Sequence, residues 1–242
     1  MACGTQPLEE RSPSDSGSVV RVDDGDTVQV KLDRDGAVRR VRLIGVDTPE
    51  RDDSREDERY WAELATRFAV HHLLGGRVSL SYDWEREDRY GRTLAYVWTE
   101  RGELFNRRLI LEGFSPAFLS YRFRKDYRTD FRRDEAEARR EGRGRWRKED
   151  PEALEVEQAR GHAGEYGAVR FRCSRVTAGR RYHFLWTADS RFQALVSKNI
   201  AWPKPAASHF PGREWSVTGI LEPEGNILKV YVLFPRQMAE RN

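Results

Sequence analysis

The sequence predicts a mixed α+β protein that is mainly β: a five-stranded barrel with three helices, followed by a second, small all-β unit. Two observations lead to this fold class. Short runs of alternating apolar residues, typical of half-buried strands, are separated by turns that contain Gly and Asp. Longer runs with apolar residues at helical spacing occur in the first 147 residues, whereas the remainder shows strand patterns.

The composition is that of a soluble globular chain. Of 242 residues, 38% are hydrophobic and 34% are charged, and the net charge is +3. No apolar run approaches the ~20 residues needed to cross a bilayer, so we expect no transmembrane segment. The first residues lack the apolar core of a signal peptide. Residues 1–16 are rich in Ser, Pro, Gly and charge, and we expect a disordered tail there.

Three strands are expected before the first helix. Apolar alternation predicts strands at Ser18–Val22 and Asp26–Leu32. The pair Asp35-Gly36 then predicts a tight two-residue hairpin. The return strand, Val38–Val46, loses its alternation before Gly45, which indicates a bulge or a close backbone contact at that glycine.

Helices are expected after the third and the fifth strand. Residues Trp61–Leu73 carry apolar side chains at helical spacing, and Gly75-Gly76 ends the pattern. The other elements of this half are strands at Arg77–Tyr82 and Thr93–Thr99 and helices at Leu104–Glu112 and at about Asp126–Glu141. Five short strands with helices at these places are the plan of the OB-fold, a five-stranded Greek-key barrel. We place this domain at residues 17–147.

A second domain is expected after a linker. Residues 148–164 are charged and weakly patterned, and we interpret them as a linker that is partly helical. From residue 165 strand patterns return at barrel-like spacing, which predicts a second OB-like barrel over residues 165–242. The expected strands are Ala168–Val176, Arg181–Thr187, Arg191–Ser197, Glu214–Leu221 and Ile227–Phe234, with a Pro- and Ala-rich loop at Trp202–Gly212.

This second half is basic. From Glu165 onward, 12 Lys and Arg stand against 6 Asp and Glu, whereas the residues before it hold 31 and 34. Tyr182, Phe184 and Trp186 alternate on one expected strand, with arginines nearby in sequence. Aromatic and basic groups on a barrel face are how single-stranded nucleic acid is held. The alternative is that the rings fill the interior of the barrel and that the surface charge is merely uneven.

Residues 41–50, with the sequence VRLIGVDTPE, are the stretch most suggestive of chemistry. Pro49 fixes its own φ and restricts the residue before it, so Asp47 and Glu50 lie on a stiff turn. Arg42 stands just before this corner. Two carboxylates and a guanidinium at the end of a strand suit a site where a hard cation and an anion meet.

Three ordered motifs resemble the staphylococcal nuclease (thermonuclease) family. They are DGDT, with Asp26; RLIGVDTPE, with Arg42, Asp47, Thr48 and Glu50; and DRYGRTLAYV, with Tyr90 and Arg92. The resemblance covers roughly residues 17–146, a little over half of the chain, and implies the same OB barrel. It also implies a hydrolase: a calcium-dependent, sugar-nonspecific endonuclease that cleaves DNA and RNA to products with a 3′-phosphate.

The resemblance assigns a role to each residue of the site. It implies metal ligands at Asp26, Asp47 and Thr48, the last through its backbone carbonyl, and catalytic positions at Arg42, Glu50 and Arg92. The chemistry agrees, because carboxylate and carbonyl oxygens hold a hard divalent cation such as calcium, and no His or Cys nearby in sequence favours zinc. Guanidinium groups bind phosphate oxygens in pairs, and a free carboxylate can deprotonate or orient water. Taken singly, each residue could equally be a turn stabiliser or a surface ion-pair partner; their joint occurrence argues against that interpretation.

The substrate contacts are expected to include two tyrosines. Tyr90 and Tyr121 fall where the family has tyrosines beside the nucleotide, whereas Leu119 stands where a further tyrosine is expected. The expected partners are DNA and RNA, single-stranded or frayed. Two alternatives stay open: a non-catalytic nucleic-acid-binding or protein-binding module on the same barrel, and a chain whose main function lies in its C-terminal domain.

The two cysteines give no disulfide framework. Cys3 lies in the expected tail and Cys173 in the second half, so we expect no bond between them. The start MACGTQ is compatible with a mature lipoprotein in which Cys3 carries the lipid. Because the resembled family is often exported, a secreted or cell-envelope location is favoured over the cytoplasm. The natural substrate and the oligomeric state are not readable from the sequence.

Overall fold

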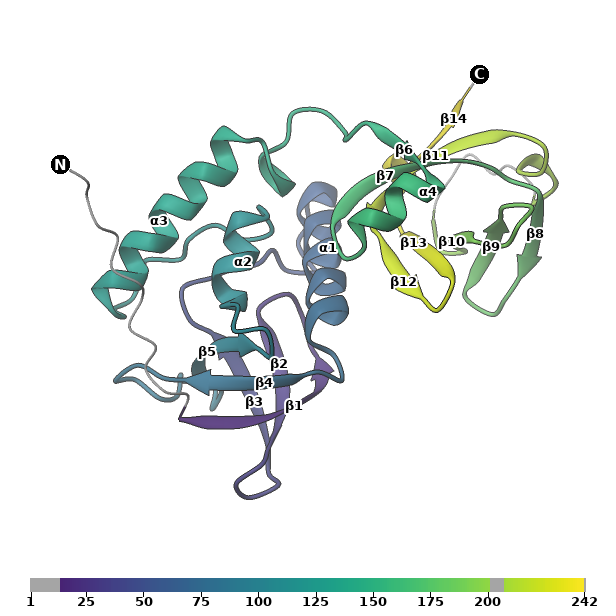
Figure 1. Ribbon diagram of the computed structural model, residues 1–242. Coiled ribbons are helices and arrows are strands. Elements are labelled where there is room, and N and C mark those ends of the chain that lie inside the picture. The colour runs from purple at the N-terminus through teal and green to yellow at the C-terminus, as the bar shows by residue number, and fades with distance from the viewer. Residues whose placement is uncertain (1–13, 201–206, 242) are drawn as a thin grey trace.

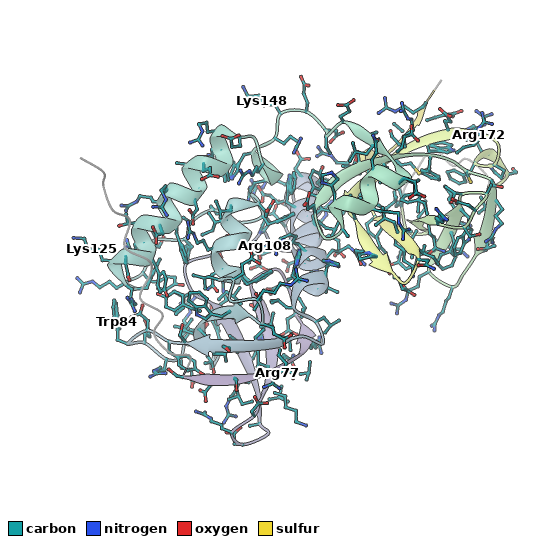
Figure 2. The ribbon with its side chains drawn as sticks, viewed as in Figure 1. Arg77, Trp84, Arg108, Lys125, Lys148 and Arg172 are labelled. Atoms are coloured by element: carbon teal, nitrogen blue, oxygen red, sulfur yellow. The ribbon has the colours of Figure 1, made fainter. Side chains whose placement is uncertain are left out.

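The computed structural model describes residues 14–200 and 207–241. Figure 1 shows a barrel with helices on one side of it and, beside it, a second unit made mainly of strands. Lys148 lies on the connection between the two units (Figure 2). The described part of the chain contains no helix long and apolar enough to span a membrane. Most of the expected tail, including Cys3, lies outside the described residues, but Asp15 and Ser16 belong to the first strand.

The strands of the first unit close into a barrel, as predicted. They are β1 (Asp15–Val22), β2 (Thr27–Leu32), β3 (Val38–Leu43), β4 (Arg77–Ser81) and β5 (Thr93–Thr99), in the closed order β1-β2-β3-β5-β4. β3 and β5 run parallel, and the other neighbours are antiparallel. This arrangement is that of the OB-fold, which confirms the predicted fold class. Alternate residues, such as Val28 and Val30 on β2, are fully buried in the barrel.

Three helices pack on this barrel. They are α1 (Glu56–Leu73), α2 (Phe105–Leu111) and α3 (Lys125–Arg140). α1 starts with an acidic first turn, which complements the positive end of its helix dipole. Leu64 and Phe68 of α1 and Phe131 of the otherwise polar α3 are buried in the same core as the barrel strands. The helices therefore close the barrel from one side (Figure 1).

The first hairpin differs from the prediction of a two-residue turn. The Leu32 N–H bonds to the Ala37 carbonyl at 2.9 Å, so the loop between them has the longer, four-residue form. Asp35 Oδ1 accepts the Ala37 N–H, and Gly36 takes a φ of +67°. Both features stabilise a longer turn, which explains why the Asp-Gly pair does not form the tight one here.

Strand β3 is shorter than the predicted Val38–Val46, because the chain turns after Leu43. Gly45 has a φ of +78°, and a Cβ on it would lie 2.5 Å from the Phe131 ring. The expected close contact at Gly45 therefore exists, but a side chain of α3 makes it, not a backbone. The bulge of this barrel lies in β1, between Val19 and Arg21.

The second unit is built from two sheets. Its strands are β6 (Ala153–Glu155), β7 (Tyr166–Arg172), β8 (Arg175–Ala178), β9 (Tyr182–Trp186), β10 (Phe192–Ser197), β11 (Glu214–Ile220), β12 (Glu222–Glu224), β13 (Ile227–Val232) and β14 (Met238–Arg241). One sheet has the order β12-β13-β10-β9-β8 and the other β14-β11-β7-β6. The chain bends from one sheet into the other between β7 and β8 and again between β11 and β12. The bend splits the predicted strand Ala168–Val176 at Cys173, which bonds through its backbone to the segment before β11.

If the two strands on either side of each bend are treated as one bent strand, the strand order of the second unit repeats that of the first barrel. β9 pairs antiparallel with β10, β10 parallel with β13, and β11 antiparallel with β7. The same relations connect β2 with β3, β3 with β5, and β4 with β1. The second unit is therefore OB-like, although its strands form two sheets instead of one closed ring. Part of the predicted loop Trp202–Gly212 lies outside the described residues.

Part of the expected linker at residues 148–164 belongs to the second unit. β6 pairs in parallel with β7, and α4 (Val156–Ala159) follows it. Ala159 is fully buried in the core of the second unit. Short 3-10 helices lie at Gly144–Trp146, Arg160–His162, Ala207–His209 and Pro235–Gln237. A strand as short as β6 carries too little periodicity to be recognised in a sequence.

Helix α1 forms the junction between the units (Figure 1). The hydroxyls of Tyr60 on α1 and Tyr166 on β7 lie 3.1 Å apart. Arg67 pairs with both carboxylate oxygens of Glu222, and its guanidinium carbon lies 3.3 Å from the centre of the Tyr231 ring. Aromatic packing and a mostly buried ion pair therefore hold the two units together.

Candidate active site

Three segments that are distant in sequence meet at one end of the first barrel. β2 begins at Thr27, which pairs with Arg42 near the end of β3 because the two strands are antiparallel. β5 is parallel to β3, and its first residue, Thr93, pairs with Val41. The residues just before β2, just before β5 and just after β3 therefore share this end of the barrel. These are the segments that hold the predicted site residues.

Arg42 is at the centre of this cluster. Its Nη1 lies 2.9 Å from Asp26 Oδ1, and its Nη2 donates to Asp47 Oδ1 at 2.8 Å. Nη1 also donates to the Val46 carbonyl at 2.9 Å, which ties the guanidinium to the corner after β3. The side chains of Arg42 and Asp26 are 12% and 7% exposed, whereas that of Asp47 is 47% exposed. One carboxylate is thus fixed in the protein and the other faces solvent.

Thr48 and Asp26 are bound to each other. The N–H and the hydroxyl of Thr48 both donate to Asp26 Oδ2, at 2.7 and 2.8 Å. Thr27 donates its hydroxyl to Asp26 Oδ1 at 3.1 Å. The ligand role predicted for the Thr48 carbonyl does not compete with these two bonds, because they use the N–H and the hydroxyl.

Residues from other elements hold the corner after β3. Ser115 Oγ accepts the Asp47 N–H at 2.8 Å, and the Tyr121 hydroxyl accepts the Gly45 N–H at 2.8 Å. Buried Asn106, on α2, donates to the Ile44 carbonyl at 2.9 Å. Sequence reasoning missed Ser115 and Asn106, since no motif marks residues that contact the corner from so far along the chain. Tyr121, predicted as a substrate contact, thus shapes the turn, and its predicted contact with substrate stays a prediction.

Glu50 lies at the exposed rim of the site. Among the described residues, no hydrogen bond or ion pair holds its carboxylate. Partial desolvation, and next the charges of Asp24 and Asp47, raise its pKa above the ordinary value, while Arg42 acts in the opposite direction. A free carboxylate beside a guanidinium is available to a bound water molecule.

Asp24 is a further acid of the site, and the sequence analysis did not select it. Burial and the charge of neighbouring Asp26 raise the pKa of Asp24 to about 6. The sequence could have indicated Asp24, because it is the first aspartate of the DGDT motif. Negative charge at this end of the barrel therefore exceeds what the guanidinium of Arg42 neutralises.

Arg92 reaches the cluster from the start of β5. Its Nη1 lies 3.5 Å from Thr27 Oγ1, the same hydroxyl that binds Asp26. Asp88 positions Arg92, because its carboxylate accepts the Arg92 N–H at 3.0 Å and the Nε–H at 2.7 Å. Tyr90 is 66% exposed, and its ring centre lies 5.5 Å from the Arg92 guanidinium carbon. Asp88 also went unselected, although it opens the DRYGR motif.

The donor set fits a hard cation. Within the described residues, no three His, Cys, Asp or Glu side chains form a ready-made metal cluster. A cation here would be held by Asp26 and Asp47, with the Thr48 carbonyl, water and substrate oxygens filling the other positions. All of these are oxygen ligands, which calcium and magnesium prefer. The excess negative charge around Asp24 is the electrostatic environment that attracts such an ion.

An OB barrel with carboxylates and guanidinium groups converging at one end defines a class of protein that binds and attacks phosphodiesters. A family model described as staphylococcal nuclease homologue matches residues 40–148. The thermonucleases of Staphylococcus intermedius and Staphylococcus hyicus are 44% and 41% identical over 117 and 119 residues. These alignments cover 47% and 49% of this chain and 68% and 67% of those proteins. An SPbeta prophage-derived endonuclease, YokF, of Bacillus subtilis is 33% identical over 129 residues, which cover 53% of this chain and 43% of YokF.

The chain belongs to the staphylococcal nuclease family. It is thus placed in a class of hydrolases, and the resemblance found in its three motifs is confirmed. The family model leaves the second unit unmatched.

Proposed function

We propose that the first unit is a calcium-dependent, sugar-nonspecific endonuclease that cleaves DNA and RNA and leaves 3′-phosphate ends. The observation that carries the proposal is the cluster in which Arg42 bridges Asp26 and Asp47, with Glu50 and Arg92 at the same end of the barrel. The names of the related thermonucleases and endonuclease support the activity. The metal, the sugar tolerance and the product ends follow from the resemblance and from the chemistry of these residues.

The two arginines would bind the scissile phosphate. Among the described residues, no hydrogen bond uses the Nε–H of Arg42, and Nη2 has a second proton beside the one that it donates to Asp47. Arg92 is held through Nε by Asp88, and Nη1 makes a long contact of 3.5 Å with Thr27 Oγ1, which leaves Nη2 and the second Nη1 proton for the substrate. Bidentate pairing suits phosphate oxygens, and each arginine could stabilise the transition state by about 3–4 kcal/mol.

Glu50 would act on the attacking water. The carboxylate takes a proton from the water, or orients it, while the water oxygen forms a bond to phosphorus. The bond from phosphorus to the 5′ oxygen breaks, and that oxygen gains a proton, which leaves a 3′-phosphate on one product and a 5′-hydroxyl on the other. A calcium ion bound by Asp26 and Asp47 would neutralise charge on the phosphoryl oxygens.

The resemblance implies the sugar tolerance, and the roles assigned to the site residues are compatible with it. Arg42 and Arg92 would bind phosphate and Asp26 and Asp47 would hold the cation, and none of these roles requires a contact with the 2′-hydroxyl. Tyr90 is exposed enough to stack on a base, and the Tyr121 O–H is free to donate once it has accepted the Gly45 N–H. Stacking on a base needs an unpaired base, so single-stranded or frayed nucleic acid is the expected substrate form.

Hydrolysis of labelled DNA and RNA with calcium, and with a calcium chelator, tests the proposal. We expect cleavage of both with calcium and none with the chelator; equal turnover in the two conditions would remove the metal assignment. Glu50→Gln should lower kcat by about 10²–10⁴-fold, because it removes the base without changing side-chain size. Glu56→Gln, an exposed acid at the start of α1, is the matched control and should keep its rate.

A further inference from the structure

The outer face of β9 carries aromatic rings that the core of the second unit does not use. Leu185 on this strand is fully buried in that core. Because side chains alternate along a strand, Phe184 and Trp186 point to the opposite, outer side, and Tyr182 shares it. All three rings are half-buried. The alternative given in the sequence analysis, that the three rings fill the interior of the barrel, is therefore wrong. Leu185, Phe192 and other apolar residues occupy that space.

Neighbouring groups hold the rings in place. Trp186 donates its Nε1–H to Thr177 Oγ1 on β8 at 3.0 Å, and the guanidinium carbon of Arg175 lies 4.6 Å from the centre of its ring. Phe184 lies over Gly179, where a Cβ would come within 2.5 Å of the ring. Rings fixed in this way bind a flat partner with little loss of conformational entropy.

The same face is positively charged. Arg175, Arg180 and Arg181 are exposed, and none of the three forms an ion pair within the described residues. On the other sheet, Arg170 is paired with Glu155. The acids on the β12 edge of this sheet are themselves neutralised: Glu222 pairs with Arg67, and Glu224 pairs with Lys229. The positive charge of Arg175, Arg180 and Arg181, on β8 and the loop that joins it to β9, therefore attracts an anion.

The position of this face in the fold matches its composition. In the strand order of the second unit, β9 and β10 are the second and third strands of an OB-fold, and the loop with Arg180 and Arg181 joins its first and second strands. OB-folds bind oligonucleotides on the face of the second and third strands and on the loop between the first and second, so β9 and the loop with Arg180 and Arg181 belong to this region. Interleaved aromatic and basic groups on it select unstacked bases and a phosphate backbone.

We propose that the outer face of β8 and β9 binds single-stranded nucleic acid through Tyr182, Phe184 and Trp186, with Arg175, Arg180 and Arg181 on the backbone. The nuclease helix α1 lies against the other edge of this sheet, where Arg67 contacts Tyr231. Tyr182 links the proposed face to this junction, because its ring centre lies 5.6 Å from that of Tyr231. The role as a substrate-holding site rests on the proposed nuclease function, whereas the binding itself does not.

Fluorescence anisotropy of a labelled oligothymidylate, measured with the full chain in a calcium chelator, tests the binding. The probe is about 20 nucleotides long, which exceeds the roughly 4–16 that one OB-fold covers. We expect single-stranded probe to bind more tightly than the matching duplex. Trp186→Ala combined with Tyr182→Ala should weaken binding about tenfold or more, because each ring loses its stacked base. Arg180→Ser with Arg181→Ser should lower the slope of log affinity against log salt by about 1.4.

Matched variants make the result decisive. Trp186→Phe keeps a flat ring and should restore most of the affinity, which a folding defect would not. Arg172→Ser removes an exposed arginine from the opposite sheet, at the far edge of the second unit (Figure 2), and should leave affinity unchanged. Unchanged affinity in the Tyr182 and Trp186 variant, with its thermal unfolding also unchanged, would overturn the inference. Equal binding of duplex and single strand would overturn it as well.

Cleavage assays separate this inference from the proposed function. If the chain binds the oligonucleotide but does not cut it with calcium, the nuclease proposal fails and the binding face stands. If it cuts, the Tyr182 and Trp186 variant should raise KM about tenfold while kcat stays the same. A variant that keeps the KM of the wild type refutes the substrate-holding role.

Discussion

The chain contains the same strand order twice, and its two barrels use it differently. In the first unit, polar groups gather at one end of the barrel, where β3 stops and Arg42 bridges Asp26 and Asp47. In the second unit, the described residues form no group of three His, Cys, Asp or Glu side chains, and the binding groups that we propose lie on the outer face of β9. The difference shows that the fold fixes which strands are neighbours, while local sequence decides which part of the barrel becomes a site.

Of the substitutions proposed, Arg42→Lys should have the largest effect: it should reduce cleavage by the first unit and leave binding by the second unit unchanged. A lysine keeps the charge but cannot bridge Asp26 and Asp47 or pair with phosphate through two parallel donors. We expect kcat for nucleic-acid cleavage to fall about 10²–10³-fold. Binding of single strands in a chelator should be unchanged, since that property is assigned to the second unit. Arg39→Lys, on the exposed side of the same strand, is the control for charge and should cleave normally.

Gly45→Ala tests why the active end of the first barrel is rigid. The substitution puts a Cβ against the Phe131 ring at a residue whose φ is +78°. Both strain and overpacking oppose it, so we expect a loss of about 2–5 kcal/mol in the free energy of unfolding. Gly36→Ala, at the far hairpin, has a φ of +67° but open space around it. It should cost about 1 kcal/mol, because only the backbone preference is lost.

If denaturant unfolding gave the two glycine variants the same stability, packing by Phe131 would not be what holds the corner after β3. A loss at Gly45 that spared catalysis in the folded fraction would likewise separate the corner from the active site.

The junction between the barrels should be sensitive to acid. Burial, and next the charge of Arg108, lower the pKa of His72 to about 4, while its bond to the Gly164 carbonyl at 3.1 Å acts the other way. A histidine with a depressed pKa stabilises the fold in its neutral form, so this stability is present above about pH 6.5 and is lost as pH falls towards 4. The loss should reach up to about 3 kcal/mol. Unfolding of His72→Phe measured over this pH range should show a smaller decline, and an equal decline would assign the acid sensitivity elsewhere.

The sequence predicted the first barrel well because its signals are local. Alternation marked the strands, helical spacing marked α1, and the motifs selected Asp26, Arg42 and Arg92, which the structure brings to one end. The residues it missed act across long sequence distances. Ser115 and Asn106 fix the corner by single hydrogen bonds, and Asp88 positions Arg92 through a carboxylate that could equally have been a surface acid.

The second unit was harder to predict for physical reasons. The strand at β6 is three residues long, and β7 bends into β8 where the backbone of Cys173 bonds to the segment before β11. Neither feature leaves a periodic pattern. The aromatic alternation in Tyr182–Trp186 was visible, but period two alone cannot say which face of a strand is the inner one. That required the burial of Leu185.

Arg67→Met should have the smallest of these effects. It tests whether the two barrels unfold together. Met keeps an apolar side chain against Tyr231 but removes the bidentate pair with Glu222, whose members are 17% and 15% exposed. We expect a coupling energy of about 1–2 kcal/mol between Arg67 and Glu222 in a double-mutant cycle with Glu222→Gln. Because the pair joins α1 to β12, its loss should also separate the unfolding transitions of the two units in calorimetry. Additive effects of the two substitutions, with a single unchanged transition, would show that other contacts, such as the hydrogen bond between the hydroxyls of Tyr60 and Tyr166, are sufficient to hold the junction.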